Sequence, residues 1–181
     1  MIFTGLKRKS NQIFFKKNLM SLLKNELKSP IDEVKKVIIF LDTNADRTSV
    51  LSSLMSMLKL SESDIKVVVF QQKLRNEQEA NEVITPKDFG WYGKIESEKL
   101  KNILTNQYDL LINYSKVDNL YLNLLLLQCK ASFKVGFAHL DKRLYDLMIR
   151  CESDERELFN EELKKYLVIL KIIPRNEQNK F

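Results

Sequence analysis

The stretch Val34–Leu58, VKKVIIFLDTNADRTSVLSSLMSML, decides the fold. Its first part, Val34–Leu41, is rich in β-branched and other apolar residues and predicts a buried strand. Its last part has apolar residues at helical spacing and predicts a helix from about 48 to 60. The polar loop between them, LDTNADRTS, contains no glycine, although the first strand-to-helix loop of many α/β proteins uses glycine to approach a phosphate. The stretch therefore predicts an α/β protein whose first loop is not of the usual phosphate-binding kind.

Strands and helices alternate along the rest of the chain. Further apolar strands are predicted at 65–70, 108–114 and 132–138, and helices at 97–107, 118–130, 142–151 and 154–173, with Ser97, Asp118 and Ser153 at their starts. This alternation is typical of right-handed βαβ units and a parallel sheet. The near-continuous apolar strands indicate a sheet that is covered on both faces. We expect one three-layer, Rossmann-like α/β domain of about four strands over residues 31–174, with a basic arm at 1–30 and a solvated tail at 175–181.

The composition narrows the possible chemistry. An apolar fraction of 44% is enough for a substantial core in a chain of 181 residues. The two cysteines, Cys129 and Cys151, are expected to be core thiols, and a single histidine, His139, makes a histidine-based metal site improbable. No apolar run approaches the ~20 residues of a membrane span, and the first residues lack the pattern of a secretory signal. We therefore expect a cytoplasmic protein with no cofactor, no metal and no transmembrane segment.

The net charge of +6 is concentrated in one segment. Residues 1–28 contain seven basic residues and one acidic residue, whereas the rest of the chain contains 23 of each. The basic pI of about 9.2 therefore describes an N-terminal arm and not a uniformly basic domain.

Within this arm, residues 11–28 have the pattern of an amphipathic helix. Phe15, Leu19, Leu22, Leu23 and Leu27 form its apolar stripe. The helix either docks this stripe on the domain and leaves its cations in water, or contacts a partner. The partner could be RNA or a ribosomal particle, or a protein, with an anionic membrane surface less favoured. The candidate contact residues are Lys7, Arg8, Lys9, Lys16, Lys17 and Lys24.

A second group of candidates follows the strands. In an open parallel sheet, ligands bind beyond the carboxyl ends of the strands. Asp42, Asn44, Asn113 and Ser115 are therefore the candidate ligand-binding residues. Turn and helix-cap roles explain the residues of the first loop equally well. Asp42 and Asp46 could bind Mg²⁺, but they lie four residues apart, whereas the phosphotransferases that use an aspartate nucleophile have two acidic residues two apart. His139 and Asp141 could form a base and its orienting partner, but no motif places a nucleophile beside them.

The segment DFGWYGKI, 88–95, contains the only aromatic-glycine cluster of the chain. A kinase interpretation of its first three residues fails because the chain has no glycine-rich loop and no catalytic-loop motif. We expect Phe89 and Trp91 to pack over the edge of the sheet, with Gly90 and Gly93 permitting tight turns. The alternative is an exposed Trp91–Tyr92 pair that binds a partner or stacks on bases.

Two resemblances accompany these patterns. The segments KKVIIFLD, YDLLINYS, NLYLNLLLLQCKASFKVGF and YDLMI resemble a family of short uncharacterised bacterial proteins without an assigned activity. Residues Tyr108–Phe137 also resemble the N-terminal domain of heptosyltransferase-type glycosyltransferases, which have a strand ending in D-L-[IV]-[IV]-[DN], an apolar helix, and then A-x-x-[KR]-[VI]-G-[FY]. The second resemblance implies a shared fold. The early glycine-rich acceptor loop of those enzymes is replaced here by LDTNADRTS.

The sequence thus favours a small non-enzymatic α/β protein that binds a macromolecular partner through its basic arm. The alternative is a degenerate or partner-completed glycosyltransferase-like domain that binds a nucleotide or sugar at the strand ends.

Overall fold

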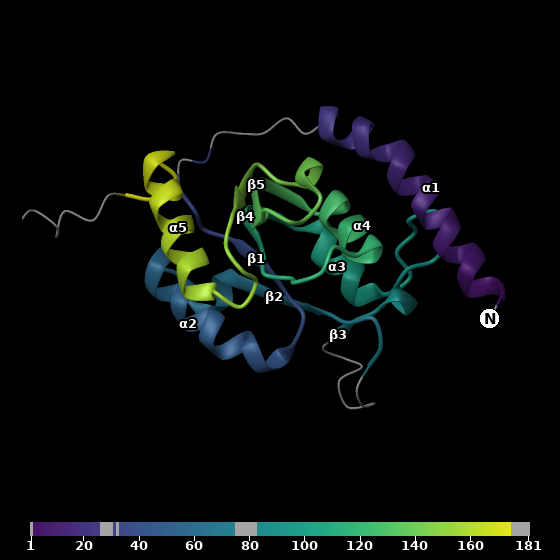
Figure 1. Ribbon diagram of the computed structural model, residues 1–181, viewed down its shortest axis with the longest axis horizontal. Helices are drawn as coiled ribbons and strands as arrows, with labels where there is room; N and C mark the ends of the chain where they lie inside the picture. The colour runs from purple at the N-terminus through teal and green to yellow at the C-terminus, as the bar shows by residue number, and fades with distance from the viewer. Residues whose placement is uncertain (1, 26–30, 32, 75–82, 175–181) are drawn as a thin grey trace, which may run out of the picture.

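The computed structural model describes residues 2–25, 31, 33–74 and 83–174, and the side chains of residues 2, 3 and 22–25 lie outside that description. A parallel sheet forms the middle layer, and helices cover both of its faces (Figure 1). The three-layer α/β class expected from the sequence is confirmed. The solvated tail predicted at 175–181 lies outside the described residues.

The sheet has six strands within the described residues, in the order β3-β2-β1-β4-β5-β6, and every pairing is parallel. Their bounds are β1 Val37–Leu41, β2 Ile65–Phe70, β3 Val83–Ile84, β4 Gln107–Asn113, β5 Lys130–Phe137 and β6 Leu147–Ile149. The chain moves outward from β1 in one direction and then returns to place β4 on the other side of it. The strand order therefore reverses between β1 and β4, which is where open α/β sheets place their ligands.

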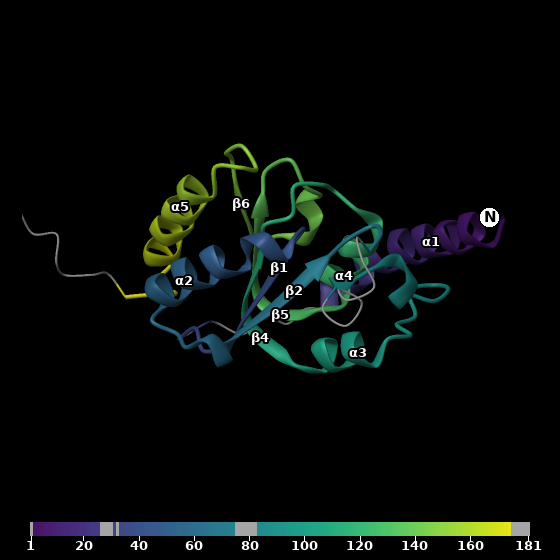
Figure 2. The same cartoon turned by 90° about the horizontal axis from the view of Figure 1, so that it is seen from below.

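Helices pack on both faces of this sheet. Their bounds are α1 Ile2–Asn25, α2 Arg47–Leu58, α3 Glu98–Thr105, α4 Leu120–Gln128 and α5 Arg156–Ile169. Helices α2 and α5 cover one face, and α3 and α4 cover the other, with α1 lying outside α4 (Figures 1 and 2). The core accordingly forms two apolar clusters, one on each side of the sheet.

Four of the strands were predicted from their apolar runs, whereas β3 and β6 were not. The prediction of a helical piece at 142–151 is wrong. Lys142–Leu144 is a single 3₁₀ turn, and the following Leu147–Ile149 pairs with β5 as strand β6. A three-residue strand has too few residues to show a period, and β5 supplies its backbone partners only in the folded state.

Two helix starts also differ from the prediction. Asn119, not Asp118, caps α4, because its side chain accepts a hydrogen bond from the backbone N–H of Tyr121 at 2.9 Å. Asp118 instead accepts a hydrogen bond from the Asn123 side chain at 2.5 Å. Helix α5 begins after Glu155 and not after Ser153. Ser97 caps α3 as expected.

Helix α1 docks on the domain, which answers a question that the sequence left open. Phe15 and Leu19 are buried in the same apolar cluster as α3, α4 and one face of the sheet. The N-terminal half of α1 extends along the outside of the molecule, and both views show it reaching past the sheet (Figures 1 and 2). None of the described helices is both long enough and apolar enough to span a bilayer.

Candidate functional site

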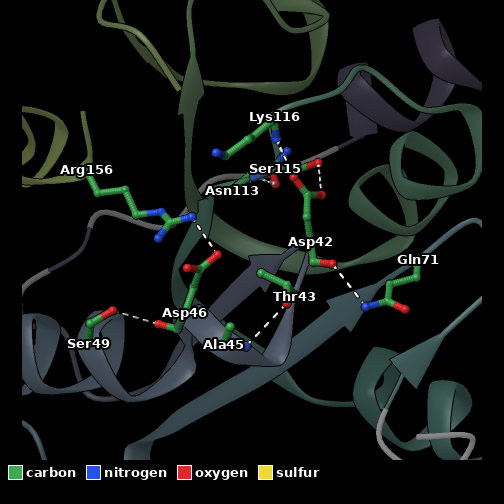
Figure 3. Close-up of polar contacts among 10 residues, drawn as sticks. All are labelled: Asp42, Thr43, Ala45, Asp46, Ser49, Gln71, Asn113, Ser115, Lys116 and Arg156. Carbon is green, nitrogen blue, oxygen red and sulfur yellow. Dashed lines mark hydrogen bonds and ion pairs between the residues drawn. The ribbon is translucent and has the colours of Figure 1, made fainter. Parts of the chain in front are cut away.

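The carboxyl ends of β1 and β4 meet at the point where the strand order reverses, and they bring Asp42 and Ser115 together (Figure 3). The carboxylate of Asp42 accepts a hydrogen bond from the Ser115 hydroxyl at 2.7 Å through Oδ1. Its Oδ2 accepts one from the backbone N–H of Lys116, also at 2.7 Å. Both oxygens of this carboxylate are therefore engaged by the protein itself.

Asn113 extends this network into the sheet. Its side chain is fully buried, and its Oδ1 accepts a hydrogen bond from the backbone N–H of Ser115 at 3.0 Å. Its Nδ2 donates to the hydroxyl of Tyr145 at 2.7 Å. Burial raises the pKa of the Tyr145 phenol, so this hydroxyl stays neutral at physiological pH. The structure thus brings together three of the four residues that the sequence predicted as ligand-binding, and it bonds them to one another.

A pocket of about 350 Å³ lies beside this network. Its lining combines the network with the ends of β2 and the start of α4: Asp42, Phe70, Gln71, Gln72, Lys73, Ser115, Val117 and Asn119. Gln71 Nε2 donates to the backbone oxygen of Asp42 at 3.3 Å, while Gln71 Oε1 is buried without a hydrogen-bond partner in the described part of the chain. Asn44, the fourth predicted residue, is not part of this lining.

The rest of the first loop is held by turns and by helix α5. The Thr43 hydroxyl accepts a hydrogen bond from the backbone N–H of Ala45 at 3.3 Å, which caps the 3₁₀ turn Asn44–Asp46. Asp46 stands at the N-cap position of α2, but its carboxylate forms an ion pair with Arg156 at 2.5 Å (Figure 3). A turn-capping hydrogen bond therefore accounts for Thr43, and the ion pair with Arg156 accounts for Asp46.

Polar side chains also gather at the ends of β5 and β6, around a pocket of about 470 Å³. His139 and Asp141 do not form the predicted pair: His139 Nε2 lies 3.1 Å from the backbone oxygen of Lys116, and Asp141 binds Arg143 at 2.6 Å. Desolvation, followed by the charges of Glu155 and Glu152, raises the pKa of the Cys151 thiol, so it stays protonated. Across the described ranges, no group of three or more possible metal ligands is present.

A different kind of candidate site lies on helix α1. Its inner face is fixed by Phe15 and Leu19, which are 7% and 1% exposed, and by the fully buried Asn11. Asn11 Nδ2 donates to the backbone oxygen of Gly90 at 3.0 Å, and Asn11 Oδ1 accepts from the N–H of Gly93 at 2.7 Å. These contacts fix α1 in its position and also hold the turn at 90–93 against it.

The outer face of α1 carries four of the six predicted basic residues. Arg8, Lys9, Lys16 and Lys17 are exposed, and Lys7 is half-buried. No ion pair involves these five cations in the part of the chain that the structure describes. The side chain of Lys24 lies outside the described residues. Leu6, Ile13 and Met20 are exposed on the same face, with 50%, 43% and 59% of their surface accessible.

Two aromatic residues stand beside this face. Trp91 and Tyr92 are 43% and 61% exposed, so the expectation that Trp91 packs over the edge of the sheet is wrong and the alternative of an exposed Trp91–Tyr92 pair holds, whereas Phe89 is fully buried against Tyr121. The backbone N–H of Tyr92 donates to the Ser10 hydroxyl of α1 at 3.3 Å. Trp91 stays outside because Gly93, with a φ of 72°, turns the chain sharply and Asn11 holds that turn.

The outer apolar row of α1 was not predicted from the sequence. The amphipathic pattern predicted one apolar side for the helix, although Leu6, Ile13 and Met20 follow one another at intervals of seven residues. That spacing was a usable signal. The stripe with Phe15 and Leu19 was correctly named as the apolar face of the helix, but the pattern alone did not show whether it docks on the domain.

The comparisons with known proteins return one match. Neither a curated protein nor a solved structure matches the chain, so the similarity to heptosyltransferase-type enzymes stays a prediction about the fold. The model of a family of unknown function, DUF6913, matches residues 7–170. The match begins within α1 and ends just after α5, and it therefore includes the docked basic helix together with the whole sheet.

Proposed function

We propose a docking function for this chain, which belongs to DUF6913, the family of unknown function whose model it matches over residues 7–170. In this proposal the protein binds an anionic partner through the outer face of α1. The single observation that carries the proposal is that α1 is fixed by its inner face while Arg8, Lys9, Lys16 and Lys17 are exposed on its outer surface.

The placement of the charge supports this proposal. Lys7 and Lys17 lie ten residues apart on α1, which is about 15 Å at 1.5 Å per residue, so the described cations are distributed over nearly three helical turns. Because Phe15 and Leu19 already hold the helix on the core, binding would not have to order it first. A preformed row of cations attracts a polyanion over about one Debye length and loses this attraction as salt is added.

The hydrogen bonds at the switch point also favour docking over catalysis. Asp42, Asn113 and Ser115 satisfy one another, and the first loop has side chains where a phosphate-binding loop needs glycine. A bound phosphate would have to displace contacts that the fold already makes. We therefore assign the function to α1 and not to this pocket.

Binding to a polyanion tests the proposal. We expect the wild-type protein to bind single-stranded polyuridylate with a log-log salt slope of about −3, since each phosphate contact contributes about 0.7. Reversing Lys16 and Lys17 to glutamate should weaken this binding by at least about ten-fold and flatten the slope. Fluorescence anisotropy over a salt series measures both quantities.

The matched control reverses Lys66 and Lys164, two exposed lysines on β2 and α5. This pair changes the net charge by the same amount, but it should leave the affinity within about two-fold, because only contact charges set the salt slope. Equal weakening by both pairs would show that net charge alone drives binding and would contradict a site on α1.

The pocket at the switch point supports a second candidate function, the binding of a nucleotide or sugar by a glycosyltransferase-like domain. The observation in its favour is Gln71 Oε1, which is buried without a hydrogen-bond partner among the described residues and lines a pocket of about 350 Å³. A ligand hydroxyl or amine could donate to this oxygen, as occurs at small-molecule sites that use a few placed polar groups.

Thermal unfolding with nucleotides and nucleotide sugars tests this second candidate. A ligand present at about 100 times its dissociation constant would stabilise the protein by about 2.7 kcal/mol, and Gln71→Leu should abolish the shift. If none of these compounds raises the melting temperature of the wild type, the pocket does not bind this class of ligand.

A further inference from the structure

Helix α1 has two apolar faces, and only one of them is covered. Phe15 and Leu19 are buried, whereas Leu6, Ile13 and Met20 form an exposed row. Seven residues are nearly two helical turns, so the row drifts by only ~20° per step and stays on one face for about 21 Å. A row of large aliphatic side chains on the outside of a docked helix indicates a partner with an apolar surface as well as a negative charge.

Lysines flank this apolar row. Residues three and four apart are neighbours on a helix surface. Lys9 is three residues after Leu6, and Lys16 and Lys17 lie between Ile13 and Met20. Because lysine stems are themselves apolar, their ammonium groups can reach past a buried aliphatic row to an anion beside it.

The aromatic pair borders the same row. Ser10, which accepts the hydrogen bond from the backbone N–H of Tyr92, is one helical turn away from both Leu6 and Ile13. The turn that carries Trp91 and Tyr92 is held by Asn11 and by Gln128, whose Nε2 donates to the backbone oxygen of Gly93 at 3.2 Å. The backbone that carries the exposed indole and phenol is therefore held against α1, close to the part of the helix that presents Leu6 and Ile13.

From this face we infer that the partner is an anionic lipid surface, on which α1 lies flat; the inference rests on the proposed docking function. Leu6, Ile13 and Met20 would enter the boundary between headgroups and acyl chains. The exposed lysines would meet lipid phosphates and carboxylates, and Trp91 and Tyr92 would sit at headgroup depth, where amphipathic rings are favoured.

This combination fits a lipid surface better than the other anionic partners. An RNA strand could satisfy the lysines and stack on Trp91, but it offers nothing to three aliphatic side chains on the helix. A partner helix would need apolar residues at alternating spacings of three and four, whereas Lys9, Lys16 and Lys17 occupy the intervening positions here. A lipid surface is apolar and anionic at once, and it therefore accounts for the aliphatic row and for the lysines together.

Vesicle binding, with the full chain, tests the inference. We expect sedimentation with phosphatidylcholine vesicles that contain about 30% phosphatidylserine, and much weaker sedimentation with phosphatidylcholine alone. Trp91 is the only tryptophan, so its emission reports on this site and should shift to shorter wavelength when the indole leaves water. Replacing Leu6, Ile13 and Met20 together by serine should lower partitioning by at least about ten-fold while polyuridylate affinity changes by less than about two-fold.

The matched control replaces three exposed apolar residues away from α1, namely Leu158, Ile169 and Leu170, by serine, and it should partition like the wild type. Circular dichroism establishes that each variant is folded. Binding to polyuridylate without binding to anionic vesicles would overturn the lipid inference and leave the docking function standing. Binding to neither would overturn both, and vesicle binding that survives the serine variant would overturn the role of the apolar row.

Discussion

Phe159→Ala will lower the free energy of unfolding by about 3–5 kcal/mol, which is typical when a buried aromatic ring is removed from a core. Phe159 is fully buried on α5, with its ring centroid 5.1 Å from that of Tyr114 and 4.6 Å from that of Phe137. Its loss would leave a cavity between α5 and the sheet. Urea unfolding followed by circular dichroism measures the change.

The neighbouring residue provides the control. Leu158 lies on the same helix but is 40% exposed, so Leu158→Ala should destabilise by less than about 1 kcal/mol. A similar loss in both variants would contradict a core role for Phe159, because alanine is the better helix former at both positions. Because α5 also supplies Arg156 to Asp46 and Asn160 to Tyr114, Phe159 indirectly supports the first loop.

Gly93→Ala will destabilise the protein by about 2–5 kcal/mol. The backbone of Gly93 has a φ of 72°, a conformation that costs an L-residue with a Cβ about 1–2 kcal/mol. A Cβ at this position would overlap the ring of Phe14, so the ring or the turn must also move, at a cost of about 1–3 kcal/mol. Thermal unfolding of the variant measures the sum.

Gly5→Ala is the matched substitution, and its effect should have the opposite sign. Gly5 lies within α1, and a Cβ there would meet no atom within 4 Å. Alanine should therefore stabilise by about 0.5–1 kcal/mol, because glycine is a poor helix former. If Gly93→Ala were as well tolerated as Gly5→Ala, the contact between α1 and the turn would not be the fixed junction described above.

The four central strands could be predicted because their own sequences contain enough apolar residues to identify them. The apolar runs of β1, β2, β4 and β5 are long enough to be recognised without knowledge of their neighbours. Strands β3 and β6 have two and three residues, and their extended conformation depends on hydrogen bonds to β2 and β5. No local pattern could separate Leu147–Ile149 from the end of a short helix.

For the candidate ligand-binding residues, too, one part could be predicted from the sequence and another part depended on the tertiary structure. That Asp42, Asn113 and Ser115 converge follows from the rule that parallel strands present their carboxyl ends at one edge. That they bond to one another, with the Asp42 carboxylate accepting from both Ser115 and Lys116, depends on the spacing of β1 and β4 and on side-chain direction. Neither the spacing of the two strands nor the direction of the side chains can be read from the sequence.

The sequence by itself determined the α/β class, the apolar centre of the sheet and the excess of positive charge in residues 1–28. These properties follow from composition and from local periodicity. The tertiary structure alone decided that the stripe with Phe15 and Leu19 docks on the domain, where it meets α4 and its neighbours. Once that stripe is inside, Leu6, Ile13 and Met20 must face outward beside the lysines. The surface that we propose for docking is thus a consequence of packing, since a helix with two apolar rows can bury only one against a single core.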